Sequence, residues 1–138
     1  RVWTGPDLRR VDAPIGRDPR NRLRMALVDL ARQAGKVAAT EVRLLQNGSA
    51  CCLVECTLQT GRTHQIRVHM ASLGHPLIGD AVYGGAAMAG LHRQALHAFR
   101  LAFDHPISGQ PLSFSADMPG DMTSALPSLG LSYNAASD

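Results

Sequence analysis

Residues 60–70 of this 138-residue chain read Thr-Gly-Arg-Thr-His-Gln-Ile-Arg-Val-His-Met. They follow residues 50–59, a run that predicts a β-strand. Gly61 permits a tight bend after that strand, and the hydroxyl of Thr63 is suited to cap the start of a helix. The stretch therefore gathers cations and hydrogen-bond donors at a strand-to-helix turn, where they can face an anionic partner.

The residues after this turn have the spacing of an amphipathic helix. Ile66, Met70 and Leu73 recur at intervals of four and three, so we expect one apolar face that packs inward. Gly74 and Pro76 are ordinary signals for the end of a helix. The sequence thus predicts one well-marked helix directly behind the donor-rich turn.

The composition is typical of one globular domain. Hydrophobic residues make up 45% of the chain and charged residues 18%. No stretch approaches the roughly 20 apolar residues of a membrane span, and no secretory signal is visible in the arginine-rich first residues. Because the sequence begins at Arg1 rather than at a methionine, we expect a fragment or a processed product. Its domain portion is expected at residues 1–122, and a frayed tail at residues 123–138.

Positive charge is concentrated in the first half of the sequence. Residues 1–67 contain 12 Lys/Arg and 6 Asp/Glu, whereas residues 68–138 contain 2 and 5. Arg17, Arg20 and Arg22 lie in a segment that two prolines and a glycine make irregular. A solvated arginine surface on a mobile loop is the ordinary alternative. Together with the donor-rich turn, the pattern favours a nucleic-acid-binding face.

The three cysteines, Cys51, Cys52 and Cys56, lie in one expected strand and form no Cys-x-x-Cys pair. We expect reduced, structural thiols in a cytoplasmic protein. His64 and His69 are five positions apart, a spacing that fits no common zinc motif. The sequence therefore predicts no metal site.

The coarse secondary structure is α+β. Residues 23–34 read as a helix, because their leucines recur on one face. An Asn-Gly-Ser turn at residues 47–49 is a strong hairpin signal, and a short helix is expected after Pro119. Strands are expected, in two hairpins, at residues 36–46, 50–59, 95–103 and 112–116. The expected architecture is a mixed, mainly antiparallel sheet with β-hairpins and one packed helix.

Residues 61–70 resemble the third motif of RluA/RluD-type pseudouridine synthases. The similarity runs in order from about residue 11 to residue 122, which is most of the chain. In that family the counterpart of residues 23–34 is shorter and feeds a strand, so residues 29–33 would be a small insertion. The further matching segments are Gly35-Lys36, residues 75–80, Tyr83-Gly84, residues 93–98 and residues 105–109.

The resemblance implies an enzyme that isomerises uridine to pseudouridine in structured RNA, most of all large-subunit ribosomal RNA, without a metal or redox cofactor. In the family, the arginine at the place of Arg62 pairs with an aspartate of a His-Arg-Leu-Asp motif. That motif is absent here: Asp12, the nearest candidate, has the wrong neighbours and lies too close to Arg62. We expect the aspartate and an active-site tyrosine upstream of Arg1, and no activity from this chain alone. The residues expected to bind RNA are His64, Gln65, Ile66, Arg67, His69, Arg17, Arg20, Arg22, Lys36 and Arg93.

Three functions remain open from the sequence. The first is part of an isomerase, and the second is an RNA-binding module without catalysis, which leads if these residues are the whole protein. The third is a structural remnant in which Arg62 pairs with Glu55 or Asp80. The isomerase and the RNA-binding module both require RNA as a partner, and neither function involves a membrane. A fragment separated from the rest of its sheet would expose strand edges and apolar faces, which predicts self-association.

Overall fold

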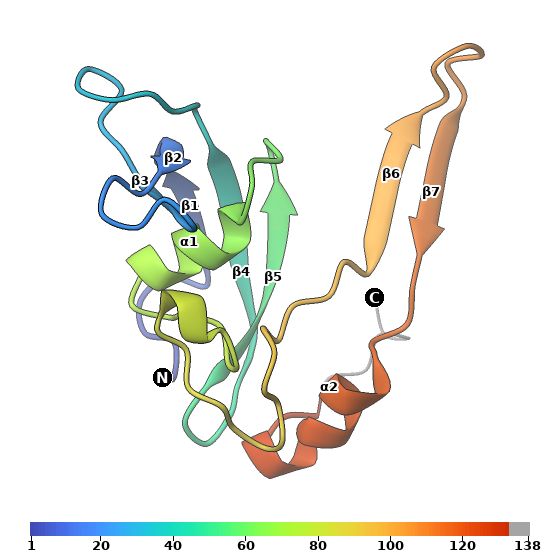
Figure 1. Ribbon diagram of the computed structural model, residues 1–138. Coiled ribbons are helices and arrows are strands. Elements are labelled where there is room, and N and C mark those ends of the chain that lie inside the picture. The colour runs from blue at the N-terminus through green and yellow to red at the C-terminus, as the bar shows by residue number, and fades with distance from the viewer. Residues whose placement is uncertain (133–138) are drawn as a thin grey trace.

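The computed structural model describes residues 1–132 and has an α+β fold with three antiparallel sheets. The largest sheet has the strand order β1-β4-β5, and the pairs β2-β3 and β6-β7 form the other two (Figure 1). The elements are β1 (Leu8–Asp12), β2 (Ile15–Arg17), β3 (Met25–Leu27), β4 (Ala39–Asn47), β5 (Cys52–Leu58), α1 (Gln65–Ser72), η1 (Ala81–Tyr83), β6 (Arg100–Asp104), β7 (Pro111–Ser115), α2 (Gly120–Ala125) and η2 (Pro127–Leu129). The expected fold class is confirmed. Within residues 1–132, every helix is too short or too polar to cross a membrane.

The hairpin β4–β5 brings the chain to the donor-rich turn. Asn47 pairs with Cys52, and the amide of Gly48 donates to the carbonyl of Cys51 across the tight connection. The predicted hairpin is therefore confirmed. Its first strand begins at Ala39 rather than at Lys36, because Lys36 forms an isolated bridge with Ile15 instead.

Helix α1 packs against the three-stranded sheet through the predicted apolar residues. Met70 is buried with Trp3 and Val42, and Ile66 and Leu73 pack around them. An eight-residue helix has little stability of its own, so this packing holds it in place. Trp3 is thus a core residue.

The end of α1 follows the predicted stop signal. Gly74 adopts a φ of 81°, and its amide donates to the carbonyl of Ala71 while the amide of His75 donates to that of Met70. This pair of bonds is a Schellman motif, which favours glycine at the left-handed position.

Residues 23–34 do not form the predicted helix. Residues 25–27 form β3, which pairs with β2, and residues 29–33 form a turn closed at the carbonyl of Asp29. Leu23, Leu27 and Leu30 are all exposed, so the helix that they suggested would have had no core to pack against. Neither the periodicity nor the resemblance predicts the short strand at residues 25–27.

One other strand prediction needs correction. The strand expected at residues 95–103 begins only at Arg100 and is the shorter β6.

The chain after residue 122 is packed rather than frayed. Ala125, Leu129 and Leu131 are buried in one cluster with Cys51 and Leu91. The predicted tail is therefore wrong for residues 123–132, and residues 133–138 lie outside the described residues. The three cysteines are free thiols. Cys51 and Cys52 pack into different clusters, and β5 begins at Cys52, so Cys51 lies just before the strand rather than in it.

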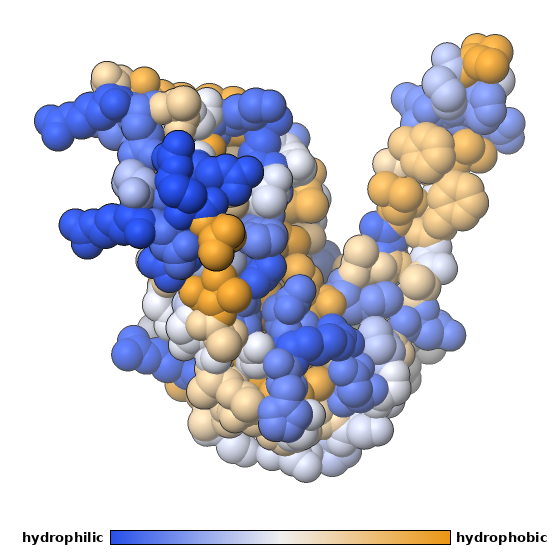
Figure 2. Space-filling model, viewed as in Figure 1, coloured by the Kyte–Doolittle hydropathy of each residue, from blue (hydrophilic) through white to orange (hydrophobic). Residues whose placement is uncertain are grey.

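The hairpin β6–β7 projects away from the rest of the molecule (Figure 1). Leu101 pairs with Phe114 and Phe103 with Leu112, so one face of the hairpin is apolar. Leu101, Phe103 and Phe114 are exposed, with exposed fractions of 61%, 44% and 56%. Figure 2 shows this apolar arm across an open gap from the main body. Such an uncovered apolar face is unusual for an isolated globular protein.

Candidate nucleic-acid interface

Arg62 lies in the loop between β5 and α1 and is held by two contacts. Its backbone amide donates to Oε1 of Gln65 at 3.0 Å, and its Nε donates to the carbonyl of Val37 at 2.9 Å. Within residues 1–132 its terminal guanidinium nitrogens have no hydrogen-bond or carboxylate partner. Arg62 therefore has a fixed stem and a free end.

The two carboxylates that the sequence offered to Arg62 belong to other arginines. Glu55 accepts from Arg43 at 3.1 Å, and Asp80 forms two bonds with Arg67. The pairing expected of a structural remnant is therefore wrong.

Gln65 connects the loop of Arg62 to β4. Its Oε1 accepts from the hydroxyl of Thr60 as well as from Arg62, and its Nε2 donates to the carbonyl of Ala39 and to Oγ1 of Thr40. Its exposed fraction is 3%. The side chain shapes the Arg62 loop from inside, so the expected contact with RNA is not open to it.

His69 continues this buried chain of hydrogen bonds. Its Nε2 lies 2.9 Å from the carbonyl of Ala13, which can only accept, so Nε2 carries the proton. Its Nδ1 then accepts from the hydroxyl of Thr40 at 2.8 Å. The ring is completely buried. The expectation that His69 contacts RNA is corrected, because both of its nitrogens and all of its surface face the protein.

Arg67 and Asp80 form a buried bidentate ion pair. Nε and one terminal nitrogen of Arg67 each donate to a carboxylate oxygen of Asp80 at 2.9 Å. Hydrogen bonding to this carboxylate raises the pKa of Arg67 above its ordinary value. The guanidinium also lies 5.0 Å from the ring centre of Tyr83. Arg67 is thus occupied within the protein, and Asp80 serves as its counter-charge.

His64 precedes α1 and bends the chain there. It has a φ of 56°, in the left-handed region, and α1 has no side-chain cap at its start, so the predicted Thr63 cap is wrong. Its Nδ1 lies 2.7 Å from the hydroxyl of Tyr83. Burial, and to a lesser extent the charge of Arg67, lower the pKa of His64. A neutral ring with an accepting Nδ1 fits this environment.

The basic loop, residues 17–24, lies beside the start of α1. Its conformation is organised by Asp18, which accepts from the amide of Arg20 and pairs with Nε of Arg24 at 2.8 Å. Hydrogen bonds from Arg24 and Arg20 lower the pKa of Asp18. Arg17, Arg20 and Arg22 are exposed and form no ion pair with any carboxylate of residues 1–132. The loop therefore presents positive charge to solvent.

The remaining expected RNA-binding residues differ in exposure. Lys36 is exposed next to β2, whereas Ile66 packs into the core with Met70. Arg93 forms a bidentate pair with Asp121 of α2, at 3.0 and 2.8 Å, and α2 lies well apart from β2 and β3, which flank the basic loop (Figure 1). The structure thus brings together Arg62, His64 and the basic loop, and leaves Arg93 outside that group.

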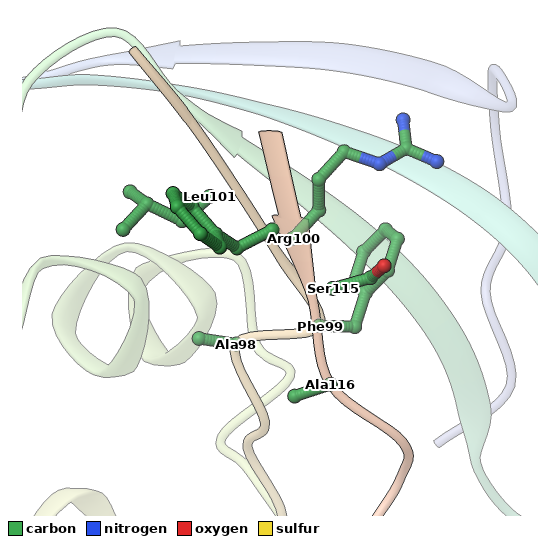
Figure 3. A pocket seen from close by; sticks show the side chains of 7 residues that line it. Ala98, Phe99, Arg100, Leu101, Ser115 and Ala116 are labelled. Atoms are coloured by element: carbon green, nitrogen blue, oxygen red, sulfur yellow. The ribbon is translucent and has the colours of Figure 1, made fainter. Parts of the chain in front are cut away.

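Two hollows on the surface of residues 1–132 lie away from this group of residues. A shallow one of about 120 Å³ lies at the base of the β6–β7 hairpin, lined by residues 98–101 and 114–116 (Figure 3). Within residues 1–132, no three His, Cys, Asp or Glu side chains are placed to hold a metal ion. The candidate interface is therefore an open cationic surface.

The roles of Thr40, Asp18 and Tyr83 were not found from the sequence. Thr40 is 29 residues from His69, and the amide of Met25 is 58 residues from the hydroxyl of Tyr83 that it reaches. Contacts at such separations leave no local pattern, and only the fold reveals them.

Comparison with known proteins identifies the relatives of this chain. Residues 8–72 match the family model described as RNA pseudouridylate synthase. Ribosomal large subunit pseudouridine synthase D from Nitrosomonas europaea is 50% identical over 127 residues, which cover 86% of this chain and 36% of that protein. The protein of the same name from Zymomonas mobilis is 49% identical over 81% of this chain and 37% of its own length. The solved structure of human RNA Pseudouridylate Synthase Domain Containing 1 superimposes with a TM-score of 0.72 at 26% identity, covering 99% of this chain and 60% of that one. The chain thus spans little more than a third of the curated relatives that it matches.

Proposed function

This chain belongs to the RNA pseudouridylate synthase family, and we propose that it forms part of the catalytic domain of an enzyme that converts uridine to pseudouridine in RNA. The reaction breaks the bond between the ribose and N1 of uracil and rejoins the ribose to C5. The C5 proton is lost to solvent and N1 gains one, so no atom is gained overall. The reaction needs a carboxylate held in its ionised form and a pocket for the extruded base.

We assign to Arg62 the role of holding that carboxylate. The observation that carries this assignment is its free guanidinium end, on a stem fixed by Val37 and Gln65, while the neighbouring Arg67 has its own acid. The aspartate is proposed to come from a segment of a longer protein outside these 138 residues. The guanidinium of Arg62 is already fixed in position, so a carboxylate that binds to it would be held in its ionised form and in one orientation.

The basic loop is proposed to bind the phosphates of the RNA. Arg17, Arg20 and Arg22 offer guanidinium groups that no carboxylate of residues 1–132 neutralises, and phosphate contacts of this kind position RNA without reading its sequence. Large-subunit ribosomal RNA is the proposed substrate, because the similar proteins from Nitrosomonas and Zymomonas are named for it. Three free thiols are consistent with a cytoplasmic location.

The proposed function is tested with the longer natural protein and a transcript of large-subunit ribosomal RNA. We expect conversion of uridine to pseudouridine, detected by chromatography of the digested nucleosides, since the two isomers have the same mass. Residues 1–138 alone should bind the transcript without converting it. If the longer protein binds RNA and forms no pseudouridine, the chain is an RNA-binding module. The observation that favours this alternative is that no carboxylate of residues 1–132 pairs with Arg62.

Residues 1–138 alone are expected to self-associate through the apolar face of the β6–β7 hairpin. Replacing Phe114 by aspartate places a charge in the centre of this face and should shift sedimentation toward the monomer. Ser113→Asp adds the same charge on the opposite face of the same strand and should leave association unchanged. Equal sedimentation of the two variants would count against this surface.

A further inference from the structure

Three segments that are distant in the sequence meet at the hydroxyl group of Tyr83. The amide of Met25, at the end of the basic loop, donates to this oxygen at 2.9 Å. The hydroxyl keeps its own proton for another partner, and Nδ1 of the neutral His64 ring, 2.7 Å away at the start of α1, can accept it. Tyr83 itself belongs to η1. One oxygen atom thus joins β3, the helix start and η1.

The ring of Tyr83 is fixed independently of its hydroxyl. The guanidinium of Arg67 lies over the ring at 5.0 Å, and the buried carboxylate of Asp80 holds that guanidinium. Met25 and Tyr83 also pack against the cluster of Ile15, Ala38 and Val68. Removing only the hydroxyl would therefore leave the ring in place.

The basic loop has a second connection to η1. One terminal nitrogen of Arg24 donates to the carbonyl of Val82 at 3.1 Å, while its Nε pairs with Asp18. Asp18 in turn caps the amide of Arg20. Together with the Met25–Tyr83 bond, this contact fixes both the conformation of the loop and its position beside α1 (Figure 1).

The left-handed φ of His64 is a further sign that this junction is constrained. A non-glycine residue in that region is strained and persists where its surroundings fix it. The hydrogen bond to Tyr83 supplies such a constraint two residues after Arg62.

We propose that Tyr83 is a positioning residue whose hydroxyl fixes the basic loop relative to the Arg62 turn, so that both bind one RNA molecule as a single surface. The proposal rests on the proposed function. Arg17, Arg20 and Arg22 lie on the loop side of this junction and Arg62 on the helix side. RNA phosphates have fixed spacings, so an unfixed loop must be ordered again on each binding event, which weakens binding.

The test is a double-mutant cycle for RNA affinity in the longer natural protein, between Tyr83→Phe and the pair Arg17→Ala with Arg20→Ala. Tyr83→Phe removes the two hydrogen bonds of the hydroxyl and should weaken binding by at least about fivefold. The arginine pair should weaken it and reduce the slope of affinity against salt by about two, one for each arginine. In the triple variant, Tyr83→Phe should add clearly less than its own loss in the wild type, because Arg22 is then the only one of the three loop arginines left for it to position.

Three measurements separate positioning from a general loss of stability. Thr123→Val removes a hydroxyl that bonds within the α2 region and should leave RNA affinity unchanged. Amide hydrogen exchange in residues 17–25 of the Tyr83→Phe protein should accelerate while exchange in β4 and β5 stays the same. The turnover number at saturating RNA should also be retained, since Val37 and Gln65 still hold Arg62.

Additive effects of Tyr83→Phe and the arginine pair would overturn the proposal, as would unchanged exchange in residues 17–25. A wild-type protein that does not bind RNA would instead overturn the proposed function itself. The two failures are therefore distinguishable.

Discussion

Replacing Arg62 by alanine in the longer natural protein should reduce the turnover number by about 10²- to 10³-fold while RNA affinity changes little. The reason is the division of tasks on this surface. Arg62 has a fixed stem and, among residues 1–132, a guanidinium end without a partner, suited to one carboxylate. The exposed loop arginines supply charge for the RNA backbone. Losing Arg62 would leave the catalytic carboxylate without its counter-charge and its orientation, and would leave the phosphate contacts intact.

Turnover of pseudouridine at saturating RNA is the quantity to measure, together with an independent binding constant. Arg62→Lys should give an intermediate loss, because lysine keeps the charge and loses the planar fork. Arg32→Ala removes an arginine with a side chain that is 86% exposed and should change neither quantity. Wild-type turnover in Arg62→Ala would remove Arg62 from the mechanism, and an equal loss of affinity would make it a binding residue.

The hairpin β4–β5 and the helix α1 could be predicted because their signals are local. An Asn-Gly turn at residues 47–48 sets the hairpin, and the spacing of Ile66, Met70 and Leu73 sets the buried face of the helix. Gly74 ends the helix through backbone bonds that only nearby residues make. In each case the information lies within a few positions of the element.

The helix expected at residues 23–34 failed because periodicity does not report whether a core is available. Leu23 is 90% exposed, and the neighbouring residues 25–27 instead pair with β2, whose position depends on the whole fold. Burial of residues 123–132 was missed for the same reason. Leu129 and Leu131 pack in one cluster with Cys51, which lies about eighty positions earlier in the chain. No local sequence pattern predicts a contact over such a separation.

The sequence places the candidate site at a donor-rich turn, but it does not tell which donors face solvent. Gln65, Arg67 and His69 share the stretch with Arg62, and the fold turns all three toward buried acceptors. Each of these acceptors belongs to a distant segment. Gln65, Arg67 and His69 therefore support the surface through buried hydrogen bonds. Arg62 and the basic loop are the part of it that is proposed to contact RNA.

Asp80→Asn should strongly destabilise the region around α1. Asp80 has a side chain that is 1% exposed, and Arg67 one that is 13% exposed, so removal of the carboxylate leaves a buried guanidinium without a counter-charge. The loss is expected to be about 3–5 kcal/mol. Amide hydrogen exchange of residues 65–72 in the longer natural protein would measure it as a fall in the free energy of opening of α1.

The chain offers a matched control for this prediction. Asp121 forms the same bidentate pair with Arg93, but both side chains are nearly half exposed, at 46% and 44%. Asp121→Asn should therefore leave exchange almost unchanged, because solvent screens an exposed pair and rehydrates the arginine that is left. A third variant, Asp80→Leu with Arg67→Met, should recover most of the lost stability. It places two apolar side chains where the ion pair was, so no charged group has to be desolvated on folding. Equal effects of Asp80→Asn and Asp121→Asn would show that burial is not what makes the Arg67–Asp80 pair strong. The cost would then have to come from the bonding geometry that the two pairs share.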